Sequence, residues 1–179
     1  LVDTIPPQST ISPVAGIYNQ ELDLTVGCSD DSGSGSFSSF LTTSSKVPTL
    51  SSTPLAGSFR LSSSSTATYF SLDSAGNSED IQTAVYVLDF APPTVLVSPL
   101  AGIYQPGQEI VLECQDTIGC LAIYFTTNGS TPNTSSQTYS GPLTVNSDLT
   151  LSLFGGDLAG NHSTLQSLGY EVDSTSPVV

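Results

Sequence analysis

LTLSLFGGDLAGN, at residues 149–161, combines a strand pattern with a turn pattern. Leucine stands at every second position from 149 to 153, which is typical of a β-strand that buries one face. In DLAGN, at 157–161, we expect Asp to accept hydrogen bonds from N–H groups about two residues on. We also expect Gly and Asn to tolerate the left-handed conformation. A similar unit, STATYFSLDSAGN, occupies residues 65–77, so the sequence predicts two copies of one unit.

Two further motifs repeat in the same order. SPVAGIY at 12–18 is matched by SPLAGIY at 98–104, and DTIPP at 3–7 is matched by DFAPP at 89–93. A looser version, DSTSP, lies at 173–177. Proline fixes φ and favours an extended residue before it, so these joints predict short, stiff linkers.

The repeat sets the predicted domain boundaries. We expect a first, divergent module at 1–90 and a second module at 91–174. Residues 175–179 would then begin a linker to a further module, which makes the chain an excised piece of a longer protein.

Alternating apolar residues predict further strands. Residues 22–28, LDLTVGC, and 110–114, IVLEC, have apolar side chains at every second position. This period is typical of half-buried antiparallel strands. Residues 121–125, LAIYF, predict the next strand, with Leu121, Ile123 and Phe125 facing inward. We expect an all-β chain of two tandem immunoglobulin/fibronectin-III-like β-sandwiches, joined by a short Pro-rich linker.

The composition excludes several classes of partner. The 179 residues include 16 Asp and Glu but only two basic residues, Lys46 and Arg60, for a net charge of −14. Nucleic acids and anionic membranes both require clustered basic residues, so neither is an expected partner. No window of about 20 apolar residues exists that could insert into a membrane.

A family resemblance rests on the second copy. YFTTNGSTP at 124–132, together with DLAGN at 157–161, resembles the chitobiase/β-hexosaminidase C-terminal-like module over nearly all of residues 92–173. The resemblance implies an immunoglobulin-like sandwich from a bacterial surface or secreted protein. It implies a spacer or binding module and transfers no catalytic residues. The first copy departs from the pattern at 44–48, SSKVP.

The three cysteines divide into a pair and a single residue. Cys114 and Cys120 occur together in the second copy only, which predicts a local disulfide if the compartment is oxidising. Their spacing fits no common zinc pattern. Cys28 is predicted to be a small buried hydrophobe, with an intermolecular disulfide as the alternative.

Calcium is the one cofactor that the acidic residues suggest, because calcium takes six to eight oxygen ligands. The pattern is not that of an EF-hand, and the second copy replaces Asp31 by Thr117 and Glu79-Asp80 by Ser163-Thr164. No cofactor is otherwise expected. The candidate ligands are Asp30, Asp31, Asp73, Asp89, Asp157 and Asp173.

Catalysis is not expected. His162 is the only histidine, and the GxSxG motif of serine hydrolases is absent. Paired carboxylates could perform glycoside chemistry, but no acid lies in an apolar run that would raise its pKa.

We therefore expect a non-catalytic, extracytoplasmic fragment that acts as a stiff spacer, an adhesive module or both. Its partners would be neighbouring modules and an unknown protein or glycan ligand. The alternative is a carbohydrate-binding accessory to a glycoside hydrolase, which would need exposed aromatic rings. The candidate rings, equally interpreted as half-buried packing, are Tyr18, Tyr104, Tyr124 and Tyr139.

Overall fold

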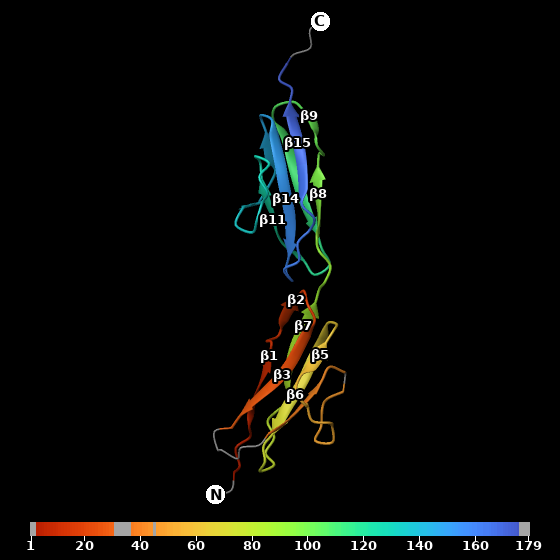
Figure 1. Ribbon diagram of the computed structural model, residues 1–179, viewed down its shortest axis with the longest axis vertical. Helices are drawn as coiled ribbons and strands as arrows, with labels where there is room; N and C mark the ends of the chain where they lie inside the picture. The colour runs from red at the N-terminus through yellow and green to blue at the C-terminus, as the bar shows by residue number, and fades with distance from the viewer. Residues whose placement is uncertain (1–2, 31–36, 45, 176–179) are drawn as a thin grey trace. The chain divides into compact units, whose positions relative to one another are not determined.

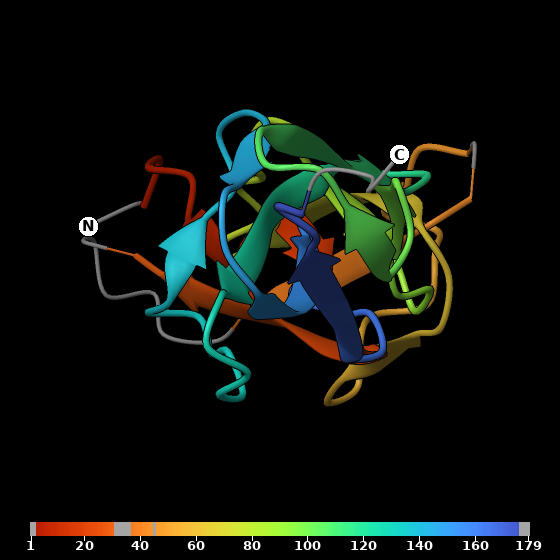
Figure 2. The same cartoon turned by 90° about the horizontal axis from the view of Figure 1, so that it is seen from above.

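The computed structural model of the protein describes residues 3–30, 37–44 and 46–175. In this part of the chain all regular secondary structure is β-strand (Figure 1 and Figure 2), which confirms the predicted fold class. The chain divides into two compact units, Leu1–Asp89 and Phe90–Val179. The predicted third segment, 175–179, lies almost entirely outside the described residues.

The first unit is a sandwich of two sheets. One sheet has the order β1-β3-β5, and the other has the order β2-β7-β6-β4. Neighbouring strands are antiparallel except β2 and β7, which are parallel. The described strands are β1 (Gln8–Ser12), β2 (Gly16–Tyr18), β3 (Leu22–Ser29), β4 (Ser38–Thr42), β5 (Phe59–Leu61), β6 (Ser65–Leu72) and β7 (Gln82–Leu88).

The second unit repeats this plan with one additional strand, β12, on the edge of β11. Its sheets have the orders β13-β10-β8 and β12-β11-β14-β15-β9. Figure 1 shows β11, β14 and β15 running side by side. The described strands are β8 (Thr94–Ser98), β9 (Gly102–Tyr104), β10 (Gln108–Gln115), β11 (Cys120–Thr126), β12 (Gln137–Thr138), β13 (Leu143–Val145), β14 (Leu149–Asp157) and β15 (Gln166–Val172).

Each unit encloses its own apolar core between its two sheets. In the first unit, Leu24 of β3 packs with Ala67 of β6 and Tyr86 of β7. In the second unit, Ile110 of β10 packs with Leu151 of β14 and Tyr170 of β15. Burial of these side chains provides the main stabilisation of each sandwich.

Two predictions about individual side chains are wrong. Leu121 is 61% exposed rather than inward-facing, because the pairing of β11 with β14 shifts between Cys120 and Ala122. Cys28 is only partly buried, near the end of β3.

Candidate functional site

The strongest common feature of the two units is the turn that follows β6 in the first copy and β14 in the second. In the first unit, Asp73 Oδ1 accepts a hydrogen bond from Asn77 N at 2.8 Å, and Oδ2 accepts one from Asn77 Nδ2 at 2.8 Å. In the second unit, Asp157 makes the same two bonds with Asn161, also at 2.8 Å. Both aspartates are buried. The Asp side chain therefore closes the turn in each unit.

This geometry extends the predicted turn in one respect and corrects it in another. Asp157 accepts backbone hydrogen bonds from Ala159 and Gly160, two and three positions on, and each Asp also bonds to the Asn four positions on. The left-handed conformation is taken by Gly76 at φ 95° and Gly160 at φ 91°, while no other residue type has positive φ in the described part of the chain. Asn is needed for its amide N–H groups, which bond to Asp, and not for backbone freedom.

The carboxyl of Asp157 has a pKa below its ordinary value. Burial by itself raises the pKa, but hydrogen bonds from the Asn161 side chain and from the backbone of residues 159–161 outweigh it. The ionised carboxylate is therefore the form that holds the turn together.

Three aspartates of the first unit lie close together near this turn. Asp3, Asp30 and Asp73 each place a carboxylate oxygen within 4.8 Å of the others. They come from the N-terminal linker, the end of β3 and the end of β6. Two of them, Asp30 and Asp73, belong to the candidate ligands chosen from the sequence, and Asp3 is an addition to that list.

The second unit repeats part of this arrangement. Asp116 and Asp157 also have carboxylate oxygens within 4.8 Å of each other. Asp116 occupies the position that corresponds to Asp30, so aligning the two copies would have predicted it as a candidate ligand. The sequence comparison considered only the neighbouring position, where Thr117 replaces Asp31.

Asp89 and Asp173 are not members of the group formed by Asp3, Asp30 and Asp73. Asp89 ends the first unit, is buried, and its N–H donates to Tyr18 O at 2.8 Å. Asp173 accepts hydrogen bonds from Thr175, which hold the pKa of its carboxyl below the ordinary value. Asp31 lies outside the described residues.

The donor set of Asp3, Asp30 and Asp73 contains the oxygen ligands that calcium prefers. However, both oxygens of Asp73 already accept hydrogen bonds from Asn77. Three carboxylates also supply fewer oxygens than the six to eight that calcium takes, unless they bind it bidentately. Calcium binding by this group stays a prediction.

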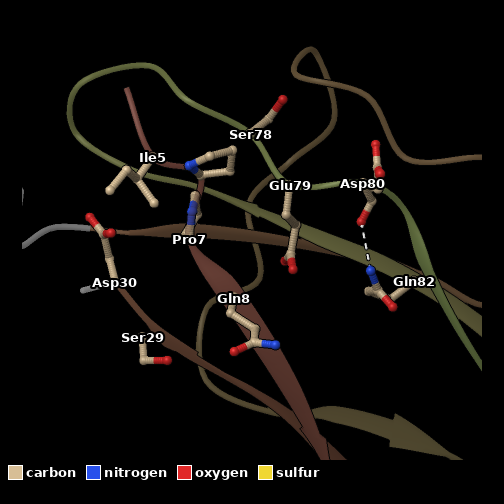
Figure 3. Close-up of a pocket in the computed structure, with 10 residues that line it drawn as sticks. Ile5, Pro7, Gln8, Ser29, Asp30, Ser78, Glu79, Asp80 and Gln82 are labelled. Atoms are coloured by element: carbon tan, nitrogen blue, oxygen red, sulfur yellow. Dashed lines mark hydrogen bonds between the residues drawn. The ribbon is translucent and has the colours of Figure 1, made fainter. Parts of the chain in front are cut away.

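A hollow of about 490 Å³ lies beside Asp30, one of these three aspartates (Figure 3). Asp30, Glu79 and Asp80 line it together with Ile5 and Pro7. The Glu79 carboxylate accepts hydrogen bonds from Ser9 N at 3.0 Å, from the Ser9 hydroxyl, and from Ser71 N at 2.8 Å. Glu79 thus ties β1 to β6 and has a structural role at this position.

The three cysteines differ in state between the two units. Cys114 and Cys120 form a disulfide between β10 and β11, with Cα atoms 6.1 Å apart. Cys28 is a free thiol in the first unit, at the position of Cys114. Burial raises the pKa of the Cys28 thiol, although a hydrogen bond from Ser71 opposes this effect.

The tyrosines chosen as possible sugar platforms are engaged in packing. Tyr18 lies against Tyr86, with ring centroids 6.4 Å apart, and its hydroxyl donates to Val14 O at 2.6 Å. Tyr104 makes the equivalent contacts with Tyr170 and Leu100. Tyr124 is buried, and Tyr139 packs against the second core.

Comparisons with known proteins agree with this arrangement. Residues 99–167 match the family described as "Chitobiase/beta-hexosaminidase C-terminal domain". The chain is also similar to a solved structure titled "Structures of Clostridium thermocellum CbhA fibronectin(III)-like modules". The identity is 15%, the TM-score is 0.50, and the similarity covers 92% of this chain and 94% of that one. No curated protein matches the chain.

These findings define the class of the protein. Both copies have the fold of immunoglobulin-like, fibronectin-III-like modules. The second copy matches the chitobiase/β-hexosaminidase C-terminal family over residues 99–167, so the predicted resemblance is confirmed. In the described residues, no helix is long and apolar enough to cross a membrane.

Proposed function

We propose that the chain is a stiff, non-catalytic spacer of a larger bacterial surface or secreted protein, located outside the cytoplasm. The matched family and the shared fold are those of accessory modules. The disulfide between Cys114 and Cys120 supports an oxidising compartment.

The observation that carries the proposal is the hydrogen bonding of the linker. Asp89, directly after β7, donates its N–H to Tyr18 of the first unit at 2.8 Å. Ala91 accepts a hydrogen bond from Asn161 Nδ2 of the second unit at 3.3 Å. Phe90 is the one residue between these two anchored positions. Pro92 and Pro93 follow and restrict the backbone further.

The same anchoring recurs at the other linker segments. Asp173, directly after β15, donates its N–H to Tyr104 O at 2.9 Å. Asn77 Nδ2 donates to Asp3 O at 3.2 Å. Each copy thus has one contact for the linker that precedes it and one for the linker that follows it, which suits a string of modules.

The proposal predicts that the two units reorient together in solution. The test is ¹⁵N relaxation of the intact chain, compared with a variant that has a six-residue insert of alternating Gly and Ser between Phe90 and Ala91. We expect one correlation time for both units in the native chain and separate, shorter values in the variant. Appending the same insert after Val179 is the control. Independent reorientation of the native units would contradict the proposal.

A further inference from the structure

The same groove occurs on both units, and it is separate from the linker contacts. In the second unit a groove of about 410 Å³ has Pro132, Phe154 and Leu165 in its lining. In the first unit a groove of about 390 Å³ has Phe70 and Ile81 at the positions of Phe154 and Leu165. Pro48 in that lining corresponds to Pro132 of the second groove. These volumes lie within the range of small-ligand sites.

The two aromatic side chains that line the second groove, Phe154 and His162, continue a row that begins at Tyr124 beneath it. The Phe154 ring stacks on Tyr124 with centroids 5.2 Å apart, and His162 lies against Phe154 at 4.9 Å. Phe154 is 8% exposed, whereas His162 is exposed. The imidazole is therefore a solvent-facing ring that buried aromatic residues hold in place.

The first groove lacks this ring. Phe70 stacks on Phe40 at 4.8 Å, but Ser78 occupies the position of His162. Glu79 and Asp80 also line the first groove, where the second unit has Ser163 and Thr164. The two grooves share an apolar frame and differ in their aromatic ring and charge.

The side chains that line the second groove indicate which kind of ligand it can bind. Its described lining contains no Asp, Glu, Lys or Arg, although the chain has a net charge of −14. Its polar groups are amide and hydroxyl groups, from Asn133, Thr134 and Ser163 among others. A cationic ligand would lose hydration there without gaining a carboxylate partner, and the net charge of −14 disfavours an anionic one. A neutral ligand with many hydroxyl groups and one apolar face fits these groups.

We propose that the groove of the second unit binds a neutral sugar ring of a glycan. The C–H face of the sugar packs on the His162 ring and on the apolar side chains of Pro132 and Leu165. The sugar hydroxyls bond to the amide of Asn133 and the hydroxyl of Thr134. Leu165, which is 52% exposed, loses contact with water on binding.

A peptide is the less suitable occupant, because peptides commonly bind by adding a strand to an exposed sheet edge. The edge of β11 beside this groove is already paired with β12 through Tyr124 and Phe125. Tyr139 N also donates to Ile123 O at 2.9 Å. The groove therefore offers side chains and not a free strand edge at these positions.

The test uses the intact chain and ¹H–¹⁵N spectra recorded with neutral gluco-, xylo-, manno- and galacto-oligosaccharides. We expect saturable shifts for at least one series at residues 131–134 and 162–165, with one site per chain. His162→Ser, which copies the first groove, should weaken binding roughly tenfold. Ser78→His, which places the ring in the first groove beside Glu79 and Asp80, is the matched control and should leave the affinity unchanged.

Thermal unfolding of each variant verifies that the fold is intact. A second variant, Leu165→Ser, removes an exposed contact and should also weaken binding. The proposal is overturned if none of the oligosaccharides shifts the groove residues, or if binding persists unchanged in His162→Ser and Leu165→Ser. Saturable binding of an uncharged apolar peptide in the groove, without any sugar binding, would likewise overturn it. None of these outcomes bears on the spacer function, which depends on the linker.

Discussion

The two units close the same end of the sandwich in different ways. In the first unit, Ser9 pairs with Cys28 across one sheet and Ser39 pairs with Ser71 across the other. The Ser71 hydroxyl lies 2.6 Å from the Ser9 hydroxyl and 2.8 Å from that of Ser39. Glu79 accepts hydrogen bonds from Ser9 and Ser71. Hydroxyl groups and one carboxylate therefore fill this end.

The second unit fills the corresponding positions with apolar groups. Val95 pairs with Cys114, and Ile123 pairs with Gly155. A Cβ added at Gly155 would lie 2.7 Å from Val95 Cγ2 and 3.5 Å from Cys114 Sγ. Cys114 is bonded to Cys120, which joins the two sheets at this end.

The comparison shows that one backbone plan permits two kinds of stabilisation. A hydroxyl cluster requires that every polar group has a partner, because an unsatisfied buried group is costly. A closely packed apolar end requires the correct volume instead. The turns at Asp73 and Asp157 are the same in both units, so they provide the reference for the predictions below.

The largest effect is expected at the shared turn. Asp157→Ala removes two hydrogen bonds to a buried carboxylate, so the second unit should lose about 3 kcal/mol of stability. Asp73→Ala should destabilise the first unit by a similar amount. Calorimetry should show each variant lowering a different transition. If either variant lowers both transitions equally, the units do not unfold separately.

The pH dependence of the same carboxyl sharpens this prediction. The pKa of Asp157 is lower in the folded state than its ordinary value of 3.8. Its contribution is therefore fully present above that value and is lost as the pH falls through the lower folded pKa. Asp157→Ala should flatten the acid limb of the second unit's stability curve, measured by urea unfolding between about pH 5 and pH 2.

The disulfide is expected to have the next largest effect. The bond between Cys114 and Cys120 closes a short loop, so replacing both cysteines by Ala should cost the second unit about 2.5 kcal/mol. The first unit, with a free thiol at Cys28, should keep its unfolding transition. The check is denaturant unfolding of the native chain and the double variant. An equal loss in both units would contradict local stabilisation.

Volume sensitivity should distinguish the two ends. Gly155→Ala forces a methyl group against Val95, and such overpacking should cost about 2 kcal/mol in the second unit. The matched variant Ser71→Ala keeps the volume but removes hydroxyl bonds in the first unit, at a cost of about 1 kcal/mol. Thermal unfolding of both variants provides the measurement. Unchanged stability of the Gly155→Ala variant would contradict the close packing of this end.

The smallest effect is expected from Tyr86, the core tyrosine of the first unit, which corresponds to Tyr170 in the second. Burial, together with Tyr18 and Tyr69, raises the pKa of Tyr86 to about 12 from an ordinary value of 10.0. The stabilisation is complete below that ordinary value and is lost as the pH rises towards the folded pKa. At about pH 11 the first unit should lose about 1 kcal/mol. Tyr86→Phe should remove this loss in alkaline titrations, and an unchanged titration would contradict it.

Much of the fold could be predicted because the period-two pattern and the repeated turn are local signals. The leucines from 149 to 153 and the DLAGN turn lie where the pattern predicts them. The exposed Leu121 could not be predicted, because a register shift between strands leaves no local mark. The grouping of Asp3 with Asp30 and Asp73 also depends on three distant segments meeting at one end.

The His162 groove lay outside sequence reasoning for a similar reason. The histidine was considered only as a catalytic residue beside a turn. Its contact with Phe154 depends on the turn folding back over the outer face of β14. The four tyrosines drew attention as aromatic residues, but cross-strand packing engages them.

The central claim is that each unit is a complete sandwich around its own core. The most direct test is calorimetry of residues 90–175 produced alone. The account predicts one cooperative transition, with a midpoint within a few degrees of the corresponding transition of the whole chain. A fragment without a cooperative transition, or without native chemical shifts at Ile110 and Leu151, would contradict the claim.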